Sequence, residues 1–124
     1  MIKEIIEKHK LKVDSYYESK EQAYKDPNKE IAEELTLFLQ RKWEKQIPKG
    51  WYGFMGLGHP TPLSWFYAID DYFTYLLSKN PNFKILQVKV KFGALIIYLD
   101  EISQDTEKEL SELCQTMSDK NLVY

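Results

Sequence analysis

The chain of 124 residues has the length of a single domain and can bury a core of its own. Its 17 basic and 19 acidic residues are well mixed, and the formal net charge of −2 argues against nucleic-acid binding, which needs a basic surface. The single cysteine, Cys114, excludes a disulfide framework and a cysteine-rich zinc site. Neither a signal-peptide core nor a membrane-spanning run of about 20 apolar residues is recognisable. We therefore expect a cytoplasmic protein away from membranes.

Two amphipathic helices are predicted in the first part of the chain. Apolar residues recur at helical spacing over residues 2–25, which predicts a long first helix. Asp26 followed by Pro27 is typical of a helix start and predicts a second helix that ends at Pro48. The buried stripe of this second helix is expected to follow Ile31, Leu35, Phe38, Leu39 and Lys42.

The segment from Pro48 to Pro62 holds four of the five glycines and three of the five prolines, which predicts a long loop. Its aromatic residues, among them Trp51 and Phe54, require the loop to lie against the core or a ligand. Whether it covers a ligand or fills the core stays open at this point. A part of it such as 51–54 could instead add a short strand to the hairpin predicted below.

Two more helices are predicted on either side of that hairpin. One begins between residues 61 and 64, runs to about Ser78 and is apolar on most of its circumference, so we expect it at the centre of the domain. The last helix is predicted to begin at Thr106, which has capping-box spacing to Glu109. Its buried stripe would consist of Leu110, Leu113, Cys114 and Met117.

The strongest pattern in the sequence is a period of two across residues 83–100, which predicts a β-hairpin. A two-residue type II′ turn at Gly93-Ala94 would pair Phe92 with Leu95. One face of this hairpin is apolar and needs a helix on it, because an isolated hairpin is marginal in water. Its residues would be Leu86, Val88, Val90, Phe92, Leu95, Ile97 and Leu99. The second face would carry Gln87, Lys89, Lys91, Ile96, Tyr98 and Asp100.

These elements predict an α+β fold in which about four helices pack around a β-hairpin, or around a small antiparallel sheet if a strand is added. The order along the chain is three helices, the two strands of the hairpin and a last helix. We find no repeat, low-complexity segment or linker, so a single domain is expected over residues 1–124.

No catalytic or metal-binding motif is recognisable. The two histidines, His9 and His59, lie in different predicted elements, and neither has a second metal ligand at the usual spacing. Asp70 and Asp71 are adjacent on a helix and project about 100° apart, so they cannot jointly hold one metal. We therefore expect no metal, no cofactor and no catalysis. The alternative is a small nucleotide-processing enzyme in which His59 works with one of these carboxylates.

The second face of the hairpin is the best candidate site. Lys89 and Lys91 share this face with Tyr98, and lysines beside an aromatic ring suit a small anionic ligand or an acidic patch on a protein. The structural alternative is that the lysine stems cover apolar surface while their charged ends reach water. With residues of the loop closing over the face, the candidate ligand-binding residues are Lys49, Trp51, Tyr52, His59, Trp65, Lys89, Lys91 and Tyr98.

Residues 87–98, QVKVKFGALIIY, resemble the signature QVKEKFGGLRFY of small proteins of unknown function, many of them encoded by phages and prophages. Trp65 and Phe66 fit the Trp-Phe/Tyr pair that opens the helix before the hairpin in that family. Val90 and Ile96 stand where the family has Glu and Arg, and the cysteine pairs that often flank this region are absent, so no metal knuckle is implied. The resemblance implies a phage or prophage accessory protein.

Three functional hypotheses follow for the chain. The first is a binding protein in the host cytoplasm, such as a host-defence antagonist that sequesters a small anionic, nucleotide-like ligand or masks a host protein. The second is the nucleotide-processing enzyme described above. The third is a structural or assembly protein that forms a homo-oligomer such as a homodimer, with its interface near Tyr16, Tyr17 and Tyr24 of the first predicted helix.

Overall fold

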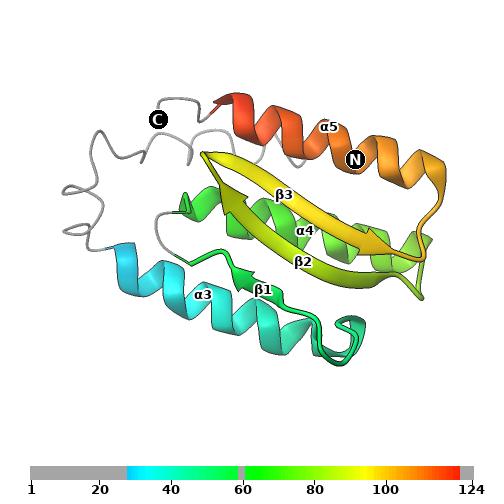
Figure 1. The fold of residues 1–124 in the computed structure, drawn as a ribbon, viewed down its shortest axis with the longest axis horizontal. Helices are drawn as coiled ribbons and strands as arrows, with labels where there is room; N and C mark the ends of the chain where they lie inside the picture. Colours follow the sequence, from blue (N-terminus) through cyan, green and yellow to red (C-terminus); the bar gives the residue numbers. More distant parts are fainter. Residues whose placement is uncertain (1–27, 59–60, 121–124) are drawn as a thin grey trace.

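The computed structural model describes residues 28–58 and 61–120, and this part of the chain has an α+β fold with three α-helices and a three-stranded sheet (Figure 1). The first helix predicted over residues 2–25 and the predicted start at Asp26-Pro27 lie outside the described residues. The elements are α3 (Asn28–Lys42), the 3-10 helix η2 (Glu44–Gln46), β1 (Gly53–Gly56), α4 (Leu63–Lys79), β2 (Lys84–Lys91), β3 (Ala94–Asp100) and α5 (Gln104–Lys120).

The sheet has the order β1-β2-β3 and is mixed rather than antiparallel. Strands β2 and β3 form the predicted hairpin, whereas β1 runs parallel to β2, with Gly53 opposite Gln87 and Gly56 opposite Lys89. The glycine-rich segment therefore does add a strand to the hairpin, at 53–56 rather than 51–54. The added pairing is parallel because α4 connects β1 to β2 and returns the chain to the end of the sheet where β1 began.

The turn of the hairpin lies one residue earlier than predicted, at Phe92-Gly93, and is closed by the pair of Lys91 with Ala94. Both turn residues have positive φ, 53° for Phe92 and 78° for Gly93, which is the type I′ and not the type II′ geometry. The predicted pairing of Phe92 with Leu95 is therefore wrong. Phe92 lies at the tip and is 93% exposed instead of lying on the apolar face.

A bulge in β2 changes which residues of this strand enter the core. The pairing with β3 shifts between Ile85 and Gln87, so that Leu86 has no direct partner. As a result Ile85 and Val88, which are three residues apart, are both fully buried. Leu86, predicted for the apolar face, is only half-buried.

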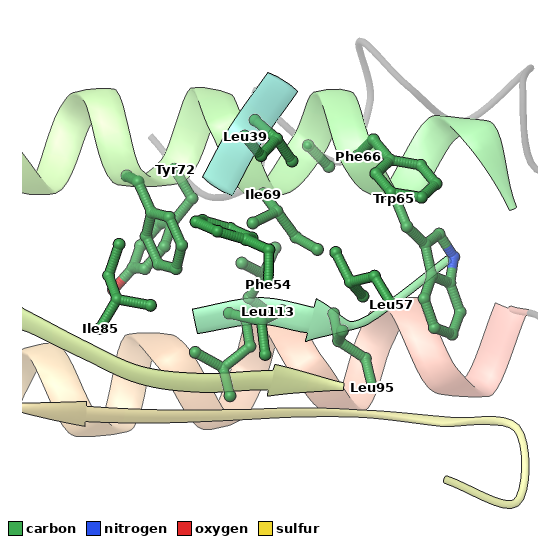
Figure 2. Packing of buried hydrophobic residues seen from close by; sticks show 14 of the residues in the cluster. Leu39, Phe54, Leu57, Trp65, Phe66, Ile69, Tyr72, Ile85, Leu95 and Leu113 are labelled. Carbon is green, nitrogen blue, oxygen red and sulfur yellow. The ribbon is translucent and has the colours of Figure 1, made fainter. Parts of the chain in front are cut away.

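Helix α4 lies behind one face of the sheet, with α3 along β1 and α5 along β3 (Figure 1). The core lies between α4 and the sheet, and Figure 2 shows Ile69 and Tyr72 of α4 among the side chains of Phe54 and Ile85. The predicted central position of this helix is confirmed. Its residues that are at most 1% exposed are Trp65, Phe66, Ala68, Ile69, Tyr72, Phe73 and Leu76.

Helix α3 is shorter than predicted, and only part of its predicted stripe, Leu35 and Leu39, faces the core. It ends at Lys42 rather than at Pro48, because the chain tightens into η2 directly after Trp43. Ile31 and Phe38, which belong to the predicted buried stripe, are 43% and 57% exposed. The buried row begins with small side chains that let the helix approach β1, and consists of Ala32, Thr36, Leu39 and Trp43.

Helix α5 begins two residues before the predicted cap, Thr106. The capping residue is Ser103, whose Oγ accepts a hydrogen bond from the backbone N–H of Thr106 at 3.2 Å. Glu109, the expected partner in a capping box, faces α4 instead and accepts hydrogen bonds from Tyr75 Oη and Lys79 Nζ, both at 3.4 Å. Thr106 is therefore a buried residue of the first turn, and not the cap.

Candidate functional site

The face of the sheet that turns away from α4 carries the predicted lysines. Alternation along the strands places Val88 and Ile97 in the core, so that Lys89 and Tyr98 project to the opposite side. We call this surface the open face. Its residues are Met55, Gln87, Lys89, Lys91, Ile96 and Tyr98, and at the far end of the hairpin the pair Lys84 and Asp100.

Lys89 lies at the centre of the open face, paired with Ile96 on one side and with Gly56 on the other. Its Nζ lies 5.5 Å from the centre of the Tyr98 ring, which is a cation–π distance. A Cβ at Gly56 would lie only 2.5 Å from the Cβ of Lys89. Glycine at position 56 therefore leaves the room that the lysine side chain occupies.

The charge of the open face is not neutralised within the described ranges of the chain. Neither Lys89 nor Lys91 has a carboxylate partner there, and the Nζ of Lys91 lies 5.7 Å from the centre of the Phe92 ring. Two apolar side chains of the open face are about half-exposed, Tyr98 at 51% and Met55 at 56%. The surface is thus basic and amphiphilic.

Two side chains of α3 that lie one helical turn apart bind backbone N–H groups on the outer side of β1, one within the strand and one two residues beyond its end. Gln40 Oε1 accepts a hydrogen bond from the backbone N–H of Phe54 at 2.7 Å, and Thr36 Oγ1 accepts one from Gly58 at 2.9 Å. The Thr36 hydroxyl also donates to the carbonyl of Ala32 at 2.9 Å. These N–H groups are therefore not available to another strand.

Helix α5 closes the edge of β3 in the same manner. Ser118 Oγ accepts a hydrogen bond from the backbone N–H of Leu95 at 2.9 Å and donates to the carbonyl of Cys114 at 2.6 Å. The backbone of Ile97 bonds to the Cys114 thiol. Burial raises the pKa of this thiol to about 11, an effect that the bond from Ile97 opposes, so the thiol is protonated at neutral pH.

Only part of the predicted ligand-binding set lies together. Lys89, Lys91 and Tyr98 share the open face. Trp51 and Tyr52 are exposed, at 49% and 63%, but the parallel register of β1 places them toward the end of the sheet opposite to Lys91.

The other three predicted residues do not join the open face in the described structure. Lys49 is exposed in the turn that precedes Trp51, and His59 lies outside the described residues. Trp65 is a core residue with no exposed surface, and Figure 2 shows its indole ring near Leu57 and Leu95. Its buried indole N–H has no hydrogen-bond partner among the described residues. A ring in this position offers no contact area to a ligand.

The sequence reasoning missed Met55 and Gly56, which complete the open face on the β1 side. The sequence pattern of β1 is short, because only Phe54 and Met55 alternate between the core and the open face, and glycines flank them at 53 and 56. Four residues are too few for a pattern of period two to be distinguished from a loop.

Asp70, a candidate partner for His59, has a structural role. Its carboxylate accepts hydrogen bonds from Lys42 Nζ at 2.8 Å and from Trp43 Nε1 at 2.9 Å, which fasten α3 to α4. No group of three His, Cys, Asp or Glu side chains suited to a metal ion occurs in the described part of the chain.

Two hollows lined by described residues lie away from the open face. One, of about 580 Å³, is lined by residues from the end of α4 and the link between β3 and α5, among them Asn80 and Glu101. The other, of about 440 Å³, lies on α5 beside Lys108. Neither brings together groups with a recognisable catalytic arrangement.

The fold and the open face define a small α+β protein that carries a basic, amphiphilic sheet surface. No family model matches the chain, and the comparisons with curated proteins and with solved structures found no match. Helices α3, α4 and α5 include none with the length and hydropathy of a membrane span.

Proposed function

We propose that this protein acts by binding an anionic partner on the open face rather than by catalysis. The observation that carries the proposal is the pair Lys89 and Lys91, which lack carboxylate partners in the described structure and lie beside the half-exposed ring of Tyr98. Ammonium groups that are not neutralised attract anions, and the ring adds apolar contact area.

The resemblance of residues 87–98 to small phage and prophage proteins supports an accessory role in a host cell. An antagonist of host defence would act by sequestering a small anionic, nucleotide-like ligand or by masking a host protein. Val90, which replaces the Glu of the signature, packs against the core, so the family's acidic position does not contribute charge to the open face.

The test is calorimetric titration of the full chain with cyclic and linear nucleotides, together with affinity capture from a bacterial lysate. The double variant Lys89→Glu/Lys91→Glu should lose whatever binding is found. The matched control, Lys45→Glu/Lys108→Glu, changes the net charge equally at exposed positions on η2 and α5 and should retain it. If neither arm detects a partner, or if both variants behave alike, the proposal is wrong.

The enzyme hypothesis would require His59 to reach a carboxylate. Asp70 already accepts hydrogen bonds from Lys42 and Trp43, so it would have to give up both bonds in order to act as the carboxylate partner of His59. We therefore do not favour a catalytic role for this residue.

A homo-oligomeric structural protein is the second candidate, and the exposed apolar residues of α3 favour it. Ile31, Leu37 and Phe38 are between 43% and 57% exposed on this helix. The residues that were expected at such an interface, Tyr16, Tyr17 and Tyr24, lie outside the described residues. Light scattering decides the question: a monomer mass at every protein concentration contradicts self-assembly.

A further inference from the structure

The closed edges of the sheet restrict how a partner can reach it. The outward N–H groups of Phe54 on β1 and of Leu95 on β3 are already bound to side chains of α3 and α5. A peptide that added a strand at either edge would have to displace these acceptors. A partner therefore reaches the sheet through the open face.

The open face also differs from a small-molecule site. Small ligands are usually held in concave sites that bury most of their surface. The hollows lined by described residues lie beside Asn80 and beside Lys108, away from the open face. In contrast, Met55 and Tyr98 belong to residue types that are enriched where proteins contact one another.

A nucleic acid fits the open face less well than a protein does. Bases of a single strand bind by stacking on aromatic rings, and the Nζ of Lys89 already lies over the Tyr98 ring at 5.5 Å. The chain as a whole carries a formal net charge of −2, which opposes the approach of a phosphate backbone. A carboxylate, in contrast, can bind Lys89 without displacing it from the ring.

The order of side chains across the strands indicates what the partner looks like. Lys89 and Lys91 form a central row on β2, with Met55 on one side and Ile96 and Tyr98 on the other. Residues two apart on a strand are separated by about 6.8 Å, and residues four apart on a helix by about 6 Å. Two carboxylates at positions i and i+4 of a helix therefore match the two lysines.

A helix also suits this surface for a second reason. An extended segment laid on a sheet face would leave its backbone N–H and C=O groups without partners, whereas a helix satisfies its own. We propose that the open face binds an acidic amphipathic helix of a partner protein, whose carboxylates pair with Lys89 and Lys91 and whose apolar side chains contact Met55, Ile96 and Tyr98. The proposal rests on the proposed binding function of the same face and names its partner.

The experiment maps backbone amide shifts of the isotope-labelled full chain by NMR. The probe is an 18-residue amphipathic helical peptide with Glu at i and i+4 flanked by Leu and Ala, and the control peptide has Lys in place of each Glu. The acidic peptide should shift the amides of Gly56, Lys89, Ile96 and Tyr98 and leave that of Leu95 in place.

Loss of two charge pairs in Lys89→Glu/Lys91→Glu should weaken binding of the acidic peptide at least about tenfold. Lys45→Glu/Lys108→Glu should bind as the unmodified chain does.

Titrations with AMP and with a ten-residue oligo(dT) distinguish this helix proposal from the broader proposal that the open face binds an anionic partner. If either binds the open face more tightly than the acidic peptide, the helix proposal is overturned while anion binding stands. If no anionic probe binds, both are overturned. Shifts centred on Leu95 or Phe54 would instead indicate strand addition at an edge, and equal binding of the acidic and basic peptides would remove the role of the lysines.

Discussion

Thr36 and Ser118 make the same pair of hydrogen bonds on opposite sides of the sheet, Thr36 to Gly58 just beyond the end of β1 and Ser118 to the edge of β3. Each hydroxyl donates to the carbonyl four residues earlier in its own helix, Ala32 for Thr36 and Cys114 for Ser118. Each also accepts a backbone N–H at 2.9 Å, and the N–H that Ser118 accepts belongs to Leu95 of β3. Each side chain thereby satisfies a backbone N–H and fixes its helix beside the sheet, and in the case of Ser118 that N–H belongs to a strand edge.

Replacing Ser118 with Ala tests this role. The N–H of Leu95 would lose its acceptor, and we expect the free energy of unfolding to fall by about 1–3 kcal/mol. Urea denaturation of the full chain measures it. The control is Ser111→Ala, an exposed serine of the same helix, which should change stability by less than about 0.5 kcal/mol. Equal effects of the two substitutions would show that Ser118 does not support the edge.

Asp70 provides a second prediction, since its two hydrogen bonds differ in burial. Trp43 is 3% exposed, so Asp70→Ala leaves a buried indole N–H without an acceptor, which should cost about 1–3 kcal/mol of stability. The ion pair with Lys42 is partly exposed and should contribute less than about 1 kcal/mol. Asp70→Asn keeps an acceptor for Trp43 and should therefore cost clearly less than Asp70→Ala. The reverse order in thermal or urea unfolding would assign the stabilisation to the ion pair.

The composition of the open face could be predicted from the sequence although the hairpin register could not. The turn lies one residue earlier than predicted, which moves the residues of β3 from Leu95 to Tyr98 by two positions along β2. A shift of two preserves the alternation, so Lys89, Lys91, Ile96 and Tyr98 stay on one face with different direct neighbours. The parallel pairing of β1 had no local signal, because its partner strand follows only after α4.

The turn itself was mispredicted because it places a bulky residue in an unfavourable conformation. Phe92 has φ of 53° and is 93% exposed, so its side chain gains little that offsets the backbone cost. Asn-Gly is the preferred pair for type I′ turns. We expect Phe92→Asn to raise the free energy of unfolding by about 0.5–1 kcal/mol, as measured by urea denaturation. Phe92→Val, with a β-branched side chain at the same φ, should lower it, and a gain in stability with Val would contradict this account.

The hydroxyl of Tyr72 is buried without a hydrogen-bond partner in the described part of the chain, and burial raises its pKa above the usual value. Removing an unsatisfied buried polar group should be favourable, so Tyr72→Phe should stabilise the protein by about 1 kcal/mol. The matched control is Tyr75→Phe, because the Tyr75 hydroxyl donates to Glu109 at 3.4 Å. That substitution should be neutral or slightly destabilising. A loss of stability in Tyr72→Phe would reveal a partner for its hydroxyl.

Cys114 predicts a pH dependence of stability in the alkaline range. Burial raises the pKa of its thiol from 9.0 to about 11, because the thiolate is poorly solvated between α5 and β3. Between these values the unfolded chain has released the proton and the folded chain still holds it. The contribution of this group is therefore fully present below pH 9 and is lost as the pH rises toward 11.

The measurement compares the unmodified chain with Cys114→Ala in urea between pH 8 and about 10.5. The variant loses the acceptor of the Ile97 backbone, which lowers its stability by a similar amount at every pH. The informative quantity is the slope: stability of the unmodified chain should fall more steeply with pH than that of the variant. The other alkaline groups titrate in both proteins and cancel in the difference, except for the part of the raised Tyr72 pKa that Cys114 causes, which is the last of its four causes in size. The structure shows a partly buried thiol, which should be alkylated in the folded chain at pH 9 at least about tenfold more slowly than in the denatured chain. Parallel curves would mean that the thiol is not shielded from solvent, and the two alkylation rates would then be equal.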